Sequence, residues 1–242
     1  MKKNKIWDLW EIFLDTLYPR RCPVCDDIVM PKGRLICEKC QKKLSYVCQP
    51  ICKKCGKEVI GEQTEYCPDC LRHPRSFDHG LALLNYNEAA RHSMAKIKYN
   101  NKRQYLDFYA DAISRRFGKL LLRMKADALV PVPIHPSRRR KRGFNQAEEL
   151  ADRIGKQLGI PVCSDLLVRT RKTLPQKELN PAERLKNLEQ AFQVQRRVGD
   201  IQRVILVDDI YTTGSTAEAC TRALCQAGVR QVYVLSVCIG KR

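Results

Sequence analysis

Residues 204–216 read VILVDDIYTTGST, in which four aliphatic side chains lead into two adjacent carboxylates and a turn rich in hydroxyl groups. Four consecutive apolar residues without alternation are typical of a central strand that is buried on both faces. Gly214 and its neighbours predict a turn into a helix, at whose start Ser215 and Glu218 have the spacing of a capping box. The stretch therefore predicts a buried strand, a tight turn and a helix in succession.

Segments with strand-like and helix-like patterns alternate from Phe77 onward. The predicted strands cover 77–86, 127–133, 160–169, 191–194, 203–209 and 231–239, and the predicted helical segments cover about 88–122, 145–158 and 215–227. Gly159 and Gly228 are expected to end the last two helices. This alternation predicts an α/β fold, a parallel sheet flanked by helices, in which ligands bind at the carboxyl ends of the strands.

Asp208 and Asp209 are expected to emerge at the carboxyl end of the strand, where a ligand would bind. The free backbone N–H groups of the following helix form a cradle for a phosphate monoester, together with the hydroxyls of Thr212, Thr213, Ser215 and Thr216. Carboxylates repel a phosphate, so the acid pair suits the hydroxyls of an attached sugar, held directly or through Mg²⁺.

Nine of the 13 cysteines lie between Cys22 and Cys70, and eight of these form CxxC pairs. The four pairs are Cys22/Cys25, Cys37/Cys40, Cys52/Cys55 and Cys67/Cys70. Each cysteine of the first two pairs recurs 30 residues later, so the segment is an internal duplication. Two CxxC pairs supply four thiolates for a tetrahedral Zn²⁺, so the pattern predicts a zinc-ribbon module with about two structural zinc ions.

Disulfide bonds are the alternative to zinc. We expect a reducing compartment, in which CxxC pairs favour a metal. Spacing leaves open which pairs share an ion, because the gap from Cys40 to Cys52 also has 11 residues. Cys48 lies outside the duplication and is expected to be a spare thiol. The other cysteines occur singly in largely apolar contexts and are expected to be buried; they are Cys163, Cys220, Cys225 and Cys238.

The net charge and the pattern of apolar residues limit the class of protein. The formal net charge is +19, of which residues 76–242 carry +14 with 30 basic and 16 acidic side chains. Such an excess favours polyanionic partners, whether phosphates, pyrophosphate or nucleic acid. No apolar run is long enough to span a membrane. Acidic residues interrupt the apolar part of the N-terminus, which argues against a signal peptide, so we expect a cytoplasmic protein.

These patterns divide the chain into three parts. Residues 1–20 have apolar positions at helical spacing and predict an amphipathic helix, which docks on the protein itself or contacts a membrane or a partner. Residues 21–75 form the tandem CxxC zinc-ribbon module. Residues 76–242 form the α/β domain.

The stretch VILVDDIYTTGST resembles the phosphoribosyl pyrophosphate (PRPP) signature of type I phosphoribosyltransferases, with four apolar residues, two acids and a Thr-Gly-x-Thr-like turn. Two further blocks are LVPVPIHPSRRRKRGFNQA at 129–147 and RTRKTLPQKELNPAERLKNLEQAF at 169–192. With the cysteine-rich module in front, the order of the blocks resembles the ComF family of late-competence proteins along nearly the whole chain. The resemblance implies a type I phosphoribosyltransferase-like sheet behind a double zinc ribbon.

The resemblance also implies roles for individual residues. Asp208 and Asp209 would hold the ribose 2- and 3-hydroxyls of PRPP, bound with Mg²⁺, and the 5-phosphate would contact Thr212, Thr213, Gly214, Ser215 and Thr216. The pyrophosphate loop would be formed by Pro133, Ile134, His135 and Pro136. A mobile lid would present Arg169, Arg171, Lys172 and Gln176.

The densest charge run consists of Arg138, Arg139, Arg140, Lys141 and Arg142. It is either a solvated face or an anion contact with local turn structure, and charge alone does not separate pyrophosphate from single-stranded DNA as the anion.

Two classes of function remain open. The ComF resemblance implies a PRPP-binding protein that handles imported single-stranded DNA in natural transformation, alongside the ComF helicase and recombination factors. The alternative is an active phosphoribosyltransferase that transfers phosphoribose from PRPP to a nucleobase or an amine. The sequence supplies the PRPP side of that reaction but identifies neither an acceptor nor a catalytic residue.

Overall fold

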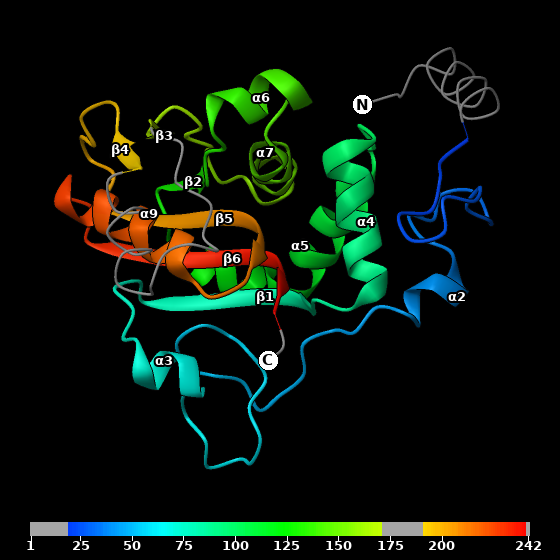
Figure 1. The fold of residues 1–242 in the computed structure, drawn as a ribbon, viewed down its shortest axis with the longest axis horizontal. Helices are drawn as coiled ribbons and strands as arrows, with labels where there is room; N and C mark the ends of the chain where they lie inside the picture. The colour runs from blue at the N-terminus through cyan, green and yellow to red at the C-terminus, as the bar shows by residue number, and fades with distance from the viewer. Residues whose placement is uncertain (1–18, 171–190, 241–242) are drawn as a thin grey trace, which may run out of the picture.

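The computed structural model describes residues 19–170 and 191–240 (Figure 1). Its central sheet has the strand order β1–β6–β5–β2, and every pair is parallel. The strands are β1 (His79–Asn85), β2 (Ala128–Pro131), β5 (Arg203–Tyr211) and β6 (Gln231–Ile239). The prediction of a parallel sheet flanked by helices is confirmed. The segment predicted as a strand at 160–169 splits into a single bridge, Val162 to Leu129, and a short strand in a separate two-stranded sheet.

Helices cover both faces of the sheet. Ile205 and Val207 of β5 belong to the same hydrophobic cluster as the apolar residues of α4 (Glu88–Tyr99), α5 (Tyr105–Arg123) and α7 (Gln146–Leu158). Val204 and Leu206 belong to a second cluster with α9 (Ser215–Gln226). All four β5 residues are fully buried, as expected for a central strand whose successive side chains point to opposite faces.

Local signals in the sequence set the ends of several elements. α7 ends at Gly159, which adopts the left-handed conformation with φ 71°, as an αL C-cap requires. The segment predicted as one largely helical stretch contains two helices, because the chain breaks at residues 100–104, where Asn101 has φ 56°. The basic run forms a further helix, α6 (Pro136–Arg142), where the sequence predicted only local turn structure.

The cysteine module packs against the edge of the sheet. It contains the short helices α2 (Glu38–Gln41), near α4, and α3 (Pro68–Arg72), next to β1 (Figure 1). Gly80 of β1 donates its N–H to the Lys54 carbonyl at 2.7 Å, and Val47 donates to the Leu83 carbonyl at 3.1 Å. A small antiparallel sheet of two strands, β3 (Leu167–Arg169) and β4 (Phe192–Val194), lies beside α9 (Figure 1).

No helix in the described ranges is long and apolar enough to cross a membrane. The predicted N-terminal helix lies outside the described residues.

Candidate functional site

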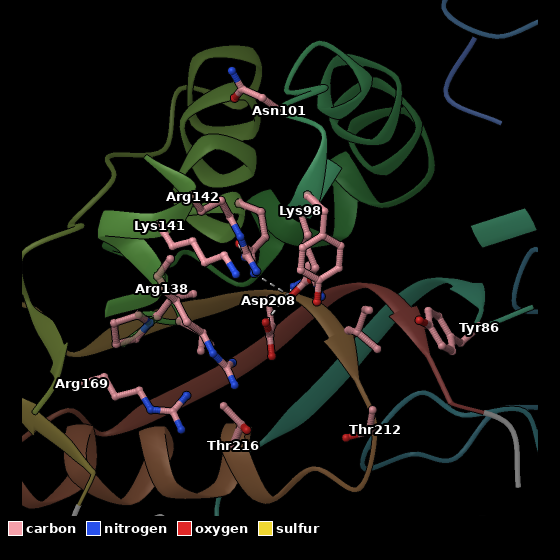
Figure 2. A pocket seen from close by; sticks show the side chains of 17 residues that line it. Tyr86, Lys98, Asn101, Arg138, Lys141, Arg142, Arg169, Asp208, Thr212 and Thr216 are labelled. Atoms are coloured by element: carbon pink, nitrogen blue, oxygen red, sulfur yellow. Dashed lines mark hydrogen bonds and ion pairs between the residues drawn. The ribbon is translucent and has the colours of Figure 1, made fainter. Parts of the chain in front are cut away.

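A cavity of about 760 Å³ opens at the carboxyl edge of the sheet, above β5 (Figure 2). It is lined by Tyr86, Lys98, Tyr99, Asn101, Val132, Pro133, Ile134, Arg138, Lys141, Arg142, Gln146, Arg169, Asp208, Asp209, Ile210, Thr212 and Thr216. Five of these side chains are cationic and two are carboxylates. The cationic side chains therefore suit an anion, and the carboxylates suit hydroxyl groups on that anion or a divalent cation bound with it.

The acid pair lies where β5 passes the end of its neighbour. β2 pairs with β5 only as far as Val207, whereas β6 stays paired with β5 to Tyr211. Asp208 is thus the first residue of β5 beyond β2. The sequence placed both acids at the strand end, and the strand continues two residues past them.

The two carboxylates have different surroundings. Asp209 is 5% exposed; it forms an ion pair with Lys98 of α4, and its Oδ1 accepts a hydrogen bond from Gln146 of α7 at 3.3 Å. Asp208 is half-buried, and its Oδ1 accepts the Asp209 backbone N–H at 2.8 Å. In Figure 2 the Asp208 side chain points into the space between Arg138 and Thr216.

These surroundings shift the two pKa values in opposite directions. Burial, and then the neighbouring Asp209 carboxylate, raise the pKa of Asp208 well above its usual value. Burial also opposes ionisation of Asp209, but Lys98 and then Gln146 outweigh it and hold the pKa of Asp209 below its usual value. The charge of Asp209 is therefore already balanced by Lys98. Within the described ranges Asp208 has no such counter-ion, so a bound cation or hydroxyl would stabilise the ionised form of Asp208 more than that of Asp209.

The turn after β5, residues 212–216, is referred to as the 212–216 loop. Gly214 is left-handed with φ 79° and immediately precedes α9, whose first N–H groups have no partner within the helix. Thr212 and Thr216 line the cavity, and the Thr213 and Ser215 hydroxyls lie 3.0 Å apart. Thr213, Gly214 and Ser215 do not line the cavity.

The predicted capping box is wrong. α9 begins after Gly214 without a side-chain cap. The Glu218 carboxylate instead accepts hydrogen bonds from the Ser76 N–H at 2.8 Å and from the Ser76 hydroxyl at 2.7 Å, and it pairs with Arg222. The local spacing predicted that Glu218 would cap the start of α9, but its carboxylate binds Ser76, which is distant in sequence.

The loop after β2 and the helix α6 form a second wall. Pro133 and Ile134 line the cavity, whereas His135 and Pro136 start α6. His135 Nδ1 accepts the Ser137 N–H at 3.1 Å, and Pro136 occupies the first turn, where its missing N–H costs nothing.

This helix divides the basic run between two faces. Arg138, Lys141 and Arg142 have the i, i+3, i+4 spacing of one helix face and line the cavity. Arg139 is exposed and pairs with Glu148 of α7 at 2.9 Å, and Arg140 is exposed. Neither of the two alternatives, a solvated face or an anion contact, describes the whole run.

Only one residue of the predicted lid lies within the described ranges. Arg169 ends β3, lines the cavity, and places its guanidinium 5.3 Å from the centroid of the Phe192 ring. Burial, and then Arg138, lower the pKa of Arg169. Arg171, Lys172 and Gln176 lie outside the described residues.

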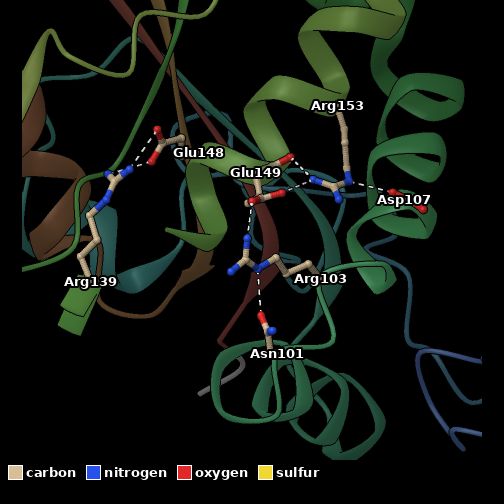
Figure 3. A network of polar contacts seen from close by, with 7 residues as sticks. All are labelled: Asn101, Arg103, Asp107, Arg139, Glu148, Glu149 and Arg153. Carbon is tan, nitrogen blue, oxygen red and sulfur yellow. Dashed lines mark hydrogen bonds and ion pairs between the residues drawn. The ribbon is translucent and has the colours of Figure 1, made fainter. Parts of the chain in front are cut away.

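A network of ion pairs lies next to the second wall of the cavity, the wall formed by the loop after β2 and by α6 (Figure 3). Arg153 of α7 pairs with Asp107 of α5 and with Glu149 of its own helix, both at 2.7 Å. Arg103 pairs with Glu149 at 3.4 Å, and its guanidinium lies 4.3 Å from the centre of the Phe144 ring. The network joins the turn between α4 and α5 to the segment that connects α6 and α7.

The residues that the α4 side contributes to the cavity were not predicted from the sequence. These are Tyr86, Lys98, Tyr99 and Asn101, to which Gln146 of α7 is added. The pair Asn100-Asn101 at the end of a helical pattern is a usable signal for a turn. Nothing local identifies Lys98, because its partner Asp209 is distant in sequence.

The eight CxxC cysteines form two groups. In the first cysteine group (Cys22, Cys25, Cys37, Cys40) and in the second (Cys52, Cys55, Cys67, Cys70), the sulfur atoms lie within 4.8 Å of one another. The structure thus resolves the pairing that spacing left open. Neighbouring sulfurs are 3.4–3.6 Å apart, which fits four ligands around one Zn²⁺ and is far longer than a disulfide bond.

The remaining cysteines divide by position. Cys220 and Cys238 are buried as predicted, and Cys48 is an exposed free thiol. The prediction that Cys225 is buried is wrong, since it lies exposed in the last turn of α9, and Cys163 is only half-buried.

Comparison with known proteins finds a matching domain family and several relatives of this chain. Residues 13–71 match the double zinc ribbon domain family. The chain is 30% identical to competence protein F of Haemophilus influenzae over 224 residues, which cover 88% of this chain and 94% of that protein. It is 26% identical to the DNA utilization protein YhgH of Escherichia coli K12, with 84% and 89% covered. A purine phosphoribosyltransferase from Pyrococcus horikoshii aligns over 56% of this chain and 72% of its own, with 16% identity and a TM-score of 0.35.

Proposed function

This chain belongs to the ComF family of competence proteins, and we propose that it binds PRPP, or a related phosphorylated sugar, with Mg²⁺, and supports the handling of single-stranded DNA in natural transformation. One observation carries the proposal: a single cavity is bounded by Thr212 and Thr216 of the 212–216 loop, by the acid pair Asp208 and Asp209 and by a wall of cations.

The three walls suit the three parts of PRPP. The N–H groups at the start of α9 and the Thr212 and Thr216 hydroxyls suit the 5-phosphate. Asp208 suits the ribose hydroxyls, while Asp209 holds Asp208 in place and balances Lys98. Arg138, Arg169 and the Pro133–Ile134 backbone suit the diphosphate.

The oxygen atoms near Asp208 also fit Mg²⁺, namely its carboxylate and the hydroxyls of Thr212 and Thr216, which line the same cavity. Mg²⁺ takes oxygen ligands and commonly binds one or two carboxylates together with phosphates. When bound, the ion would neutralise charge between Asp208 and the diphosphate. The ion's positive charge would also offset the two effects that raise the pKa of Asp208, which are burial and then the neighbouring Asp209 carboxylate.

A role with DNA rests on the competence and DNA-utilization relatives and on charge. The outward residues Arg139 and Arg140 add to the basic excess of residues 76–242. Single-stranded DNA is therefore the proposed macromolecular partner, with the ComF helicase and recombination factors as further partners. The cationic cavity face and the outward face of α6 would then bind different anions.

A second candidate is an active phosphoribosyltransferase. Tyr99, at the end of α4, and Tyr86, between β1 and α4, line the cavity; Tyr99 is 77% exposed, and the Arg142 guanidinium lies 5.7 Å from its ring centroid. An exposed aromatic ring in a cavity suits a planar acceptor such as a nucleobase. This observation supports the candidate, although no proton-transfer residue is assigned.

Calorimetry with PRPP and Mg²⁺ tests the ligand. We expect saturable binding by the wild type and its loss in Asp208→Asn, while Asp200→Asn, which removes an exposed carboxylate, binds normally. Unchanged affinity in Asp208→Asn contradicts the proposed site. Release of pyrophosphate with any member of a panel of nucleobases and amines would establish the transferase.

The salt dependence of single-stranded DNA binding tests the partner. Arg139→Ala/Arg140→Ala is expected to reduce the slope by roughly two counterions and to leave PRPP binding unchanged. Arg138→Ala/Lys141→Ala, which removes the same charge from the cavity face, is expected to weaken PRPP binding. A salt slope that neither variant alters contradicts DNA binding by α6.

A further inference from the structure

The segment that leaves the second cysteine group reaches the 212–216 loop. Arg75 donates a hydrogen bond from Nη2 to the Thr213 carbonyl at 2.6 Å. Ser76 donates through its N–H and its hydroxyl to Glu218, in the first turn of α9. Residues 75–77, here the exit segment, thus hold the loop and the start of its helix from the side of the zinc module.

A buried aromatic pair lies beneath the same loop. The Phe77 and Tyr211 rings pack edge to face, with centroids 6.3 Å apart and planes at 89°. A Cβ placed on Gly214 would lie 2.1 Å from the Tyr211 hydroxyl, so the loop rests directly on the end of the phenol. Both rings belong to the hydrophobic cluster that contains all four cysteines of the second group.

The second cysteine group is also fixed to the sheet. Gly80 of β1 donates to the Lys54 carbonyl, and a Cβ on Gly80 would lie 2.9 Å from the Cys55 carbonyl oxygen. Cys55 therefore lies against β1, while Cys67 caps the start of α3 and Cys70 lies within it, and α3 leads into the exit segment. An ion held by all four sulfurs would join these two halves.

The first cysteine group makes different contacts. Asp26, next to Cys25, accepts a hydrogen bond from Tyr105 and lies 3.6 Å from the Lys102 ammonium. Through Asp26, the first cysteine group thus supports the α4–α5 turn, which lies on the opposite side of the cavity from the 212–216 loop. The duplicated ribbons are therefore not equivalent in what they hold.

We infer that the second zinc ribbon positions the 212–216 loop, so that zinc bound by Cys52, Cys55, Cys67 and Cys70 sets the affinity of the cavity for a phosphate monoester. The identity of the ligand rests on the proposed function. The positioning itself is a property of the protein alone, and Arg75 is its main positioning residue.

The test compares Arg75→Met with Arg72→Met, which removes the same charge from an exposed position in α3. Losing a hydrogen bond from a charged donor is expected to raise the exchange rate of the Glu218 amide, which donates to the Gly214 carbonyl, about tenfold, measured without ligand. Affinity for ribose 5-phosphate falls by a similar factor, whereas affinity for pyrophosphate, which the proposed function assigns to Arg138 and Arg169, is expected to fall less. Arg75→Lys keeps a donor and is expected to recover part of the loss.

The zinc requirement is tested in Cys70→Ser. Elemental analysis is expected to show one zinc ion fewer per chain, with faster exchange of the Glu218 amide, which donates to the Gly214 carbonyl, and unchanged exchange in α7. If Cys70→Ser does not fold, the Arg75 variants still decide the inference.

Wild-type exchange and wild-type affinity for ribose 5-phosphate in Arg75→Met overturn the inference. A wild-type protein that binds neither ribose 5-phosphate nor PRPP contradicts the proposed function instead. In that case the exchange of the ligand-free loop still decides whether the ribbon positions it.

Discussion

Replacing Lys98 with Met is expected to destabilise the protein strongly, because it leaves the Asp209 carboxylate buried without its counter-ion. The side chains of Lys98 and Asp209 are 19% and 7% exposed. Removing one partner of a buried pair costs roughly 3–5 kcal/mol. Since Lys98 retains some contact with water and Gln146 still donates to Asp209, we expect the lower end, about 3 kcal/mol. For a chain of this length that lowers Tm by roughly 6–12 °C.

The sign of the pH dependence distinguishes this explanation from a simple loss of packing. Lys98 lowers the pKa of Asp209 against the opposing effect of burial. A carboxyl whose pKa is lowered in the folded state contributes stability above its unfolded pKa and loses it as pH falls through its folded pKa. The deficit of Lys98→Met should therefore be largest at neutral pH and should shrink at acid pH, where Asp209 takes up a proton.

Thermal unfolding over a series of pH values measures both effects. Lys119→Met, which removes an exposed lysine from α5, controls for the change in net charge and should stay within about 0.5 kcal/mol of the wild type. The double variant Lys98→Met/Asp209→Asn should be more stable than Lys98→Met at neutral pH. A neutral-pH Tm equal to that of the wild type, or a deficit that grows toward acid pH, would refute the reasoning.

Three further predictions concern the loop, the acid pair and the metal. Gly214→Ala should lower the Tm by more than Gly199→Ala. Both glycines have positive φ, but only a Cβ at Gly214 would meet a neighbour, the Tyr211 hydroxyl at 2.1 Å. Equal losses of Tm in the two variants would argue against the close packing of Gly214 on Tyr211. Binding of PRPP with Mg²⁺ should weaken as pH falls, because protons compete for Asp208, whose pKa burial and Asp209 raise; calorimetry in buffers of different ionisation enthalpy should detect proton release on binding, absent in Asp208→Asn. Elemental analysis should find about two zinc ions per chain, and a count near zero in a folded protein would favour disulfides.

The sequence predicted the elements whose signals are local. β6 occupies residues 231–239 as its largely apolar sequence QVYVLSVCI predicts, and α7 ends where Gly159 supplies the left-handed cap. The position of the acid pair beside a glycine turn followed from a single strand–turn–helix stretch. Such features depend on period and on special backbone conformations, which the sequence displays directly.

The features that escaped prediction depend on partners far apart in the chain. Glu218 has the spacing of a capping box, but it binds Ser76, which the docked zinc module brings beside it. α6 has no buried residue and therefore no apolar period to reveal it. Lys98 lies on α4, and only the packing of that helix at the carboxyl edge of the sheet places its ammonium against Asp209.

Strand geometry explains why two adjacent carboxylates serve different purposes. Successive residues of β5 point to opposite faces. Asp209 follows Ile205 and Val207 toward the helices α4 and α7, where Lys98 and Gln146 meet it. Asp208 follows Val204 and Leu206 toward the side of α9 and the 212–216 loop. A single carboxylate could not both neutralise the lysine beneath the cavity and remain available to a ligand. Because the pair divides these tasks, substituting Asp209 should act mainly through stability, and substituting Asp208 mainly through binding.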